Sequence, residues 1–536
     1  MFDDVYSFFF PPEKVEPTET LVDYLSLQNP PTPRYTFTQI EENKLTCIGY
    51  HPDTERAEYV DAKTVFEHVL TTGKTGVGKS SYYRSSFLAR WITFYQQSSV
   101  VIFDAMDGVI EDAITLCEKA HPSRPYIVLP DAGMNVLNCS NDPHEIASRF
   151  AQAYMQQADK GGAFFNHVAK SWILAVIPLL MATYPTVKPT LLDLRSLASD
   201  KMVRQWLVED AERRSAALPE LFTYREQFGG TGKAAADELS YNLRGLGTYL
   251  LEITSGKFAW MLNQRDAPSL ETFINDPRHP VIIMRVGDYE GSVKHTLGIL
   301  GISMVSAFIM NRDIATSGHP CLFYIDEGGL MTQTASDTTP KNLASILQTA
   351  RKRRCGFIIG LQTLEQVPKE FRETFVNGCR TIIIQPDCPP ADAKYFADMI
   401  GNARYRVTYP SESIDPDGKK RIQVSSQDKI DYIMSPDAIR NIRRDEVIVL
   451  TPYHGAKRTP LYLKKPFWEF EATPYTEPQA PNEPPQTLWQ EMGYYQTRLT
   501  ATGKPAPQPT KEQQETFLAE AEQAIQAIQG VRKKHK

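Results

Sequence analysis

From about residue 65 the chain alternates short apolar runs with longer segments of helical periodicity. Most of the short runs are continuous and rich in β-branched residues. Such runs are typical of strands buried on both faces, as in a parallel sheet covered by helices. We predict strands at 68–72, 99–104, 126–129, 281–286, 321–325, 356–361, 381–385 and 446–450. The pattern favours an α/β fold with a mostly parallel central sheet.

Between residues 129 and 281 the strand signal almost disappears and helical patterns take over. We predict an all-α insertion domain at 155–275. Two apolar stretches, at 172–181 and 296–310, are shorter than the ~20 residues that a membrane-spanning helix needs. We interpret both as buried core helices and predict no transmembrane segment in this chain.

The two ends differ in composition from the middle. Residues 1–64 are rich in Pro, Thr and Glu and predict an irregular N-terminal lead-in, with strand-like patches such as KLTCIGYH. Residues 468–536 predict a Pro/Gln-rich linker and an amphipathic C-terminal tail, which is either a frayed end or a docking helix for a partner. The α/β domain then comprises 65–154 and 276–467.

Composition narrows the class of protein. A hydrophobic content of 42% with mixed charges is ordinary for a globular protein. The net charge of −6 argues against a surface that coats nucleic acid everywhere, but it leaves room for a local basic channel. The seven cysteines are scattered without metal-ligand spacing, which indicates free thiols in a reducing cytosol.

The segment GKTGVGKS, Gly73–Ser80, matches a phosphate-binding loop at every fixed position and stands between a predicted strand and a predicted helix. Its glycines let backbone amides turn toward phosphate oxygens, and the helix N-terminus adds positive potential. Lys79 is expected to reach the β- and γ-phosphates, and Ser80 is expected to bind Mg²⁺. The predicted nucleotide-binding residues are Gly73, Thr75, Gly76, Val77, Gly78, Lys79, Ser80 and Ser81.

A second motif, CLFYIDEGG, ends a predicted apolar strand in two carboxylates. Asp326 is positioned to hold Mg²⁺ through water. Glu327 is positioned to polarise the attacking water as a general base. The second carboxylate favours an ATP hydrolase over a GTPase-like switch.

A predicted helix at 340–354 ends in four basic residues and precedes the strand at 356–361. Gln362 follows that strand. If the sheet has a RecA-like order, this strand neighbours the one that carries Asp326, so that Gln362 can contact the γ-phosphate or the water.

The series GKTGVGKS, VVIFDAMDG, IDEGG and ARKRRCGFIIGLQTLEQV resembles the TraG/TraD-like ATPases, the coupling proteins of type IV secretion and conjugation. More distantly it is similar to the FtsK/HerA motor ATPases. The resemblance covers about 65–455. It implies a RecA-like P-loop NTPase that binds ATP and Mg²⁺, with an all-α domain and a tendency to form homo-hexamers.

Carried over by position, the resemblance implies catalytic roles for Lys79, Glu327 and Gln362, with Gln362 as a sensor. Arg351 matches the arginine finger, which acts on the ATP of a neighbouring subunit. Asp104 matches an acidic position after the second strand and is either a strand-end cap or a residue near the site.

Three functions remain open at this stage. The first is a coupling ATPase that delivers relaxase–DNA or protein effectors to a secretion channel, gripping DNA without reading its sequence. The second is an FtsK/HerA-type DNA translocase, and the third is an ATP-gated protein-recruitment platform. Coupling proteins usually begin with transmembrane helices, so we expect this chain to lie at the cytoplasmic face of the bacterial inner membrane through partners.

Overall fold

The computed structural model describes residues 44–104, 108–157, 163–229, 233–287, 289, 291–312, 319–329, 339–414, 420–453, 457–467, 471–479 and 485–494. The chain divides into two compact units, Met1–Pro484 and Pro485–Lys536. The second unit contains α23 (Leu488–Glu491). The amphipathic pattern predicted toward the C-terminus falls at 495–536, outside the described residues.

The first unit is built on an eleven-stranded sheet with the order β2-β1-β13-β12-β9-β3-β8-β7-β4-β6-β5. Every strand predicted from the apolar runs is present, and those from β9 to β5 run parallel. They are β3 (Val69–Thr72), β4 (Ser99–Asp104), β5 (Tyr126–Leu129), β6 (Val281–Arg285), β7 (Cys321–Ile325), β8 (Cys355–Leu361), β9 (Thr381–Ile384) and β12 (Glu446–Tyr453). The predicted α/β class with a mostly parallel sheet is confirmed.

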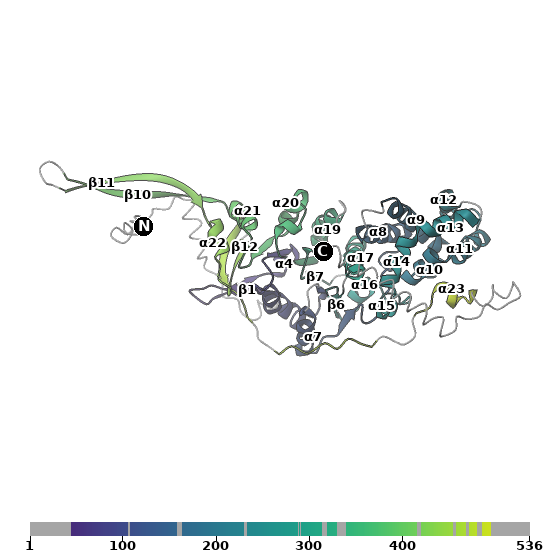
Figure 1. The fold of residues 1–536 in the computed structure, drawn as a ribbon. Coiled ribbons are helices and arrows are strands. Elements are labelled where there is room, and N and C mark those ends of the chain that lie inside the picture. The colour runs from purple at the N-terminus through teal and green to yellow at the C-terminus, as the bar shows by residue number, and fades with distance from the viewer. Residues whose placement is uncertain are drawn as a thin grey trace, which may run out of the picture. The chain divides into compact units, whose positions relative to one another are not determined.

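An antiparallel extension lies beyond β9. There β12 pairs with β9 and β13 (Lys457–Lys464), and β13 pairs with β1 (Thr46–Tyr50), which pairs with β2 (Ala57–Val60). Residues 46–60, within the segment predicted as an irregular lead-in, therefore add two strands to the sheet. A separate antiparallel ribbon consists of β10 (Asn402–Ile414) and β11 (Lys420–Tyr432) (Figure 1).

Helices cover both faces of the sheet. On one face the core contains α5 (Lys79–Tyr83), the π-helical turn η1 (Arg84–Leu88), α6 (Ala89–Thr93) and α7 (Val109–Lys119). On the other face Phe308 packs against Phe323, with ring centroids 6.3 Å apart. Phe308 lies on α17 (Gly291–Asn311), which contacts α19 (Thr339–Lys352). The remaining helices around the sheet are α4 (Ala62–Phe66), η3 (Leu364–Gln366), α20 (Lys369–Gly378), α21 (Pro390–Ile400) and α22 (Pro436–Arg440).

The described residues between β5 and β6 form helices and their connections, with no named strand, and Figure 1 shows α9 to α14 gathered together. They are α8 (Pro143–Gln157), α9 (Ala163–Thr183), α10 (Leu191–Ser199), α11 (Lys201–Arg214), α12 (Pro219–Phe228), α13 (Lys233–Asn242), α14 (Arg244–Ile253), α15 (Lys257–Met261) and α16 (Leu270–Ile274). This arrangement confirms the prediction of an all-α region within the α/β chain.

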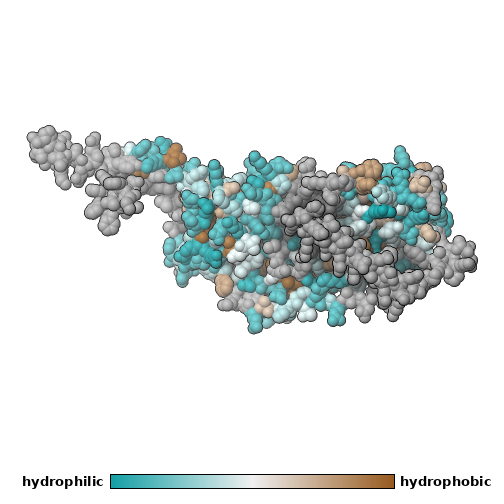
Figure 2. All heavy atoms as spheres, in the orientation of Figure 1, coloured by the Kyte–Doolittle hydropathy of each residue, from teal (hydrophilic) through white to brown (hydrophobic). Residues whose placement is uncertain are grey.

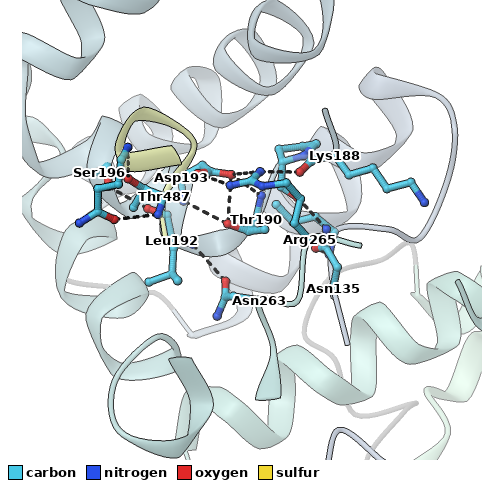
Figure 3. Close-up of polar contacts among 12 residues, drawn as sticks. Asn135, Lys188, Thr190, Leu192, Asp193, Ser196, Asn263, Arg265 and Thr487 are labelled. Atoms are coloured by element: carbon cyan, nitrogen blue, oxygen red, sulfur yellow. Dashed lines mark hydrogen bonds and ion pairs between the residues drawn. The ribbon is translucent and has the colours of Figure 1, made fainter. Parts of the chain in front are cut away.

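A buried polar cluster joins the start of α10 to the segment that follows α15. Arg265 binds the fully buried Asp193 through two nitrogens, at 2.8 and 3.1 Å (Figure 3). The amide and hydroxyl of Thr190 also donate to Asp193, at 2.8 and 3.0 Å. Since Thr190 caps α10 and Arg265 follows α15, this carboxylate ties two segments of the helical region that are 72 positions apart.

Two helices, Ala163–Thr183 and Ser292–Asn311, are long and apolar enough to cross a membrane by length and composition. In the structure α17 carries many buried side chains and packs against α8, α14 and α19. Trp172 and Ile173 of α9 are likewise buried. Both stretches therefore contribute to the protein core. On the face drawn in Figure 2 the described surface is mostly hydrophilic, with hydrophobic residues scattered among polar ones.

Candidate functional site

The carboxyl ends of β3, β8 and β7 meet at one edge of the sheet, because these neighbouring strands run parallel. The loop at 73–78 follows β3, Gln362 follows β8, and Asp326 and Glu327 follow β7. β8 lies between the other two strands, so the strand of Gln362 neighbours that of Asp326, as the RecA-like order requires. The edge therefore brings both predicted motifs and the predicted sensor together.

The loop at 73–78 has a backbone conformation that depends on its glycines. Gly76 and Gly78 have φ values of 83° and 86°, a region that favours glycine, and Gly78 is the N-cap of α5. Thr75 and Gly76 are exposed, whereas Val77 is buried beneath the loop. Ser81 lies in the first turn of α5. This geometry suits phosphate binding by loop amides and a helix N-terminus.

Lys79 is buried, and its ammonium donates to the carbonyl oxygens of Gly73 and, at 3.4 Å, Lys74. Burial lowers the pKa of Lys79, and the nearby carboxylates Glu327 and Asp326 oppose that shift. An ammonium held by loop carbonyls is the group expected to bind phosphate.

The hydroxyl of Ser80 donates to Oδ1 of Asp326 at 3.1 Å, although the residues are 246 positions apart. The hydroxyl of Tyr324 donates to the same oxygen at 2.6 Å. A hydroxyl and a carboxylate in this position are hard oxygen donors, which Mg²⁺ prefers, so the residues present fit the ion. Tyr324 was not predicted, although it lies two residues before Asp326 and so on the same side of the strand.

Glu327 is buried, and an amide holds each of its carboxylate oxygens. Nε2 of Gln362 donates to Oε2, and Nε2 of Gln366 donates to Oε1, both at 2.8 Å. Gln366 also accepts from the backbone amide of Gln362 at 2.8 Å. The two glutamines thus orient the carboxylate of Glu327. Only Gln362 was predicted.

Close packing of β7 on β8 supports this arrangement. The amide of Gly328 donates to the carbonyl of Gly360 at 2.6 Å, and a Cβ added at Gly360 would collide with the carbonyl oxygen of Asp326. The glycine therefore permits the approach that places Asp326 and Glu327 beside β8.

Two other residues predicted from the sequence lie at opposite edges of the sheet. Arg351 lies at the end of α19, before β8, and thus at the sheet edge opposite the loop; its side chain is 57% exposed and pairs with Glu67 at 2.5 Å. Asp104 accepts from the amide of Ile110 at 3.0 Å. This bond satisfies an amide in the first turn of α7, and because Asp104 ends β4 next to β7 it also lies near Asp326, so the structure is compatible with both interpretations of Asp104.

Lys465 is a further residue at the loop that the sequence did not reveal. Its ammonium donates to the carbonyl of Val77 at 2.8 Å, from the segment after β13. Burial lowers its pKa to about 8. Lys465 therefore stabilises the loop through the carbonyl of Val77.

Comparison with known proteins gives two kinds of match. A family model described as the TraM recognition site of TraD and TraG matches residues 320–444. No curated protein matches the sequence.

The structural matches include several solved forms of the plasmid coupling protein TrwB, each 14% identical. The unbound monoclinic form of the bacterial conjugative coupling protein TrwBdeltaN70 has a TM-score of 0.54 and covers 87% of this chain and 95% of its own. The complex with a non-hydrolysable ATP analogue also has a TM-score of 0.54, with coverages of 87% and 98%. The complex with ADP and Mg²⁺ has a TM-score of 0.52, with coverages of 88% and 96%.

At this identity the TrwB structures establish the fold, a RecA-like P-loop domain with an all-α domain. The predicted resemblance to type IV coupling proteins is thus confirmed: the chain has the fold of TrwB, and its residues 320–444 match the TraD and TraG family.

Proposed function

We propose that this chain is the ATPase coupling protein of a type IV secretion or conjugation system, which recruits DNA–relaxase or protein substrates and powers their delivery to the secretion channel. The observation that carries the proposal is the convergence of Ser80 and Asp326, 3.1 Å apart, beside a glycine-rich loop and a buried Glu327. The TrwB structures with nucleotides support the same chemistry, because they share this fold.

The site residues have distinct roles in this proposal. Amides of the loop and of Ser81, together with Lys79, bind the phosphates, and Ser80 and Asp326 hold Mg²⁺. The bound ion neutralises phosphate charge. Glu327 orients the attacking water and accepts its proton on a carboxylate oxygen. Gln362 reports the loss of the γ-phosphate, because it binds Glu327 directly.

Arg351 completes the site of a neighbouring subunit. It is exposed at the edge opposite its own loop, which is where a residue must lie to act in trans within a ring. The active form is a homo-hexamer in this proposal. In GTPases such arginine fingers contribute roughly 10³ to 10⁵ in rate.

The partners follow from the segment at 320–444, whose family model is described as a recognition site for the protein TraM. We expect coupling-complex and secretion-channel proteins, relaxase or effector substrates, and DNA bound non-specifically. Attachment to the cytoplasmic face of the inner membrane is through these partners. The protein-recognition description favours a recruiting protein over a DNA translocase without a secretion channel.

The test is steady-state ATP hydrolysis by the purified chain, with Lys79→Ala as the control. Single- and double-stranded DNA are titrated at low and moderate salt, and the oligomeric mass is recorded in the same samples. Turnover that Lys79→Ala abolishes and that DNA stimulates in the hexamer supports the proposal. Nucleotide binding without DNA stimulation and without a ring contradicts it and favours the recruitment platform.

A further inference from the structure

The exposed Arg351 is tied to a carboxylate of its own subunit. Nη2 of Arg351 lies 2.5 Å from Oε1 of Glu67, and Nε of Arg380 lies 3.1 Å from Oε2 of the same carboxylate. Glu67 is buried, whereas Arg351 is 57% exposed. A buried, doubly paired carboxylate is a better anchor for a long side chain than an exposed one, because less solvent screens the pair.

Glu67 is also joined to the strand that leads into the glycine-rich loop. It is the C-cap of α4, His68 follows it, and β3 begins at Val69. The carbonyl of Glu67 accepts from the amide of Arg380 at 2.8 Å, just before β9. The fully buried β3 then runs straight to Gly73. Glu67 therefore stands at one end of β3 and the loop at the other.

His68 fixes the helix of Arg351 to the same point. Nδ1 of His68 accepts from the backbone amide of Phe357 at 3.1 Å, so the remaining proton is on Nε2, which donates to the carbonyl of Leu347 at 2.6 Å. Leu347 lies one turn before Arg351 on α19. The last turn of α19, the start of β3 and the start of β8 are thus bound together.

We propose that Glu67 is a positioning residue for Arg351: it holds the guanidinium in the orientation presented to the next subunit and links that orientation to β3 of its own subunit. This inference rests on the proposed role of Arg351 as a trans-acting finger. Glu67 contacts no nucleotide of its own site, because it lies at the opposite sheet edge. Its replacement therefore affects turnover and leaves nucleotide binding to the same subunit intact.

The experiment compares full-length Glu67→Gln, Arg351→Ala and Asp276→Asn with the wild type. Asp276 is the matched control, because it pairs with the exposed Arg278 at 2.7 Å shortly before β6, at the same edge of the sheet. We expect Glu67→Gln to lower kcat about 100-fold, as a misplaced catalytic group does, with KM for ATP and the affinity for a fluorescent ADP unchanged. Asp276→Asn behaves as the wild type. Thermal unfolding of each variant confirms the fold.

Rings that contain two variants show whether Glu67 affects the site of its own subunit or that of the neighbouring subunit. Glu67→Gln has an intact nucleotide site, and Lys79→Ala has an intact Glu67–Arg351 pair, so each supplies what the other lacks. In randomly mixed rings at equal amounts, about a quarter of the interfaces combine an intact site with an intact finger. We expect the mixture to recover turnover well above that of either variant alone.

The outcomes separate the two proposals. If Arg351→Ala hydrolyses ATP as the wild type does, the proposed role of Arg351 and this inference both fail, while the coupling-ATPase function stands on its own test. If the wild type shows no turnover, the proposed function itself is refuted. If Arg351→Ala is inactive while Glu67→Gln is normal, only the positioning role of Glu67 is overturned. Loss of turnover in Glu67→Gln without recovery in mixed rings also overturns it, because Glu67 then acts on its own site.

Discussion

The buried His68 makes the stability of the α/β domain depend on pH. Burial lowers the pKa of its imidazole from 6.5 to about 4, and the contact with Leu347 only partly opposes that effect. In the unfolded chain the ring takes up a proton near pH 6.5. Between pH 6.5 and 4 the unfolded state therefore binds more protons, and stability falls as the pH falls.

The size of the effect follows from the difference of the two pKa values. A shift from 6.5 to about 4 corresponds to about 3 kcal/mol at 1.36 kcal/mol per unit. The stabilisation is fully present above pH 6.5 and is lost by about pH 4. His68→Asn removes the titration but keeps an acceptor for Phe357, and asparagine tolerates the φ of 70° found here. It leaves the carbonyl of Leu347 without its donor, which costs about 1–3 kcal/mol at neutral pH.

The assay measures urea unfolding of the wild type and His68→Asn from pH 4 to 8. A titration of ¹³C-labelled histidines assigns His68 by the signal that the variant lacks. We expect the wild type to be the more stable protein at pH 7 and the two curves to converge toward pH 4. Curves that stay parallel between pH 6.5 and 4, or a His68 signal that titrates near pH 6.5, would refute this reasoning.

Three further predictions concern single side chains. Gln366→Ala frees one oxygen of Glu327, and we expect kcat to fall about 10- to 100-fold at unchanged KM in steady-state hydrolysis assays. Lys465→Met removes a charged hydrogen bond to Val77, so the dissociation constant of a fluorescent ADP should rise about 10-fold in equilibrium titrations; an unchanged constant contradicts the bracing role. Asp193→Ala removes the buried carboxylate that Arg265 binds and should destabilise the helical region by about 3–5 kcal/mol in urea unfolding, whereas a loss within 1 kcal/mol argues against the cluster in Figure 3 as an anchor.

The fold was predictable where the local pattern is unambiguous. Strands that are buried on both faces have continuous apolar sequences, and each strand of this kind was predicted. The ribbon β10–β11 and the strand β13 were not, because their sequences mix polar residues with apolar ones and β13 contains Pro460. The turn sequence Asp417-Gly418 between β10 and β11 was the available signal for the ribbon.

The candidate site was likewise predictable only where its residues form a local pattern. The loop at 73–80 and the pair Asp326–Glu327 were found because each motif is contiguous. The contact of Gln366 with Glu327 and that of Arg351 with Glu67 join positions 39 and 284 apart. No local pattern specifies such pairs, because they depend on strand order and on the path of the chain between the strands.

The position of β3 in the sheet also determines when the nucleotide loop can form during synthesis. β3 is made early, at 69–72, yet both of its hydrogen-bonding partners, β8 and β9, lie at 355–384. At about 5–20 residues per second the ribosome needs about 15–60 s to deliver them. During that time the helical region can fold from local contacts, while β3 leaves the backbone N–H and C=O groups of both its edges unpaired. Among the strands of the sheet, the one that leads into the nucleotide loop thus waits longest for its first partner, and it needs protection from aggregation during that time.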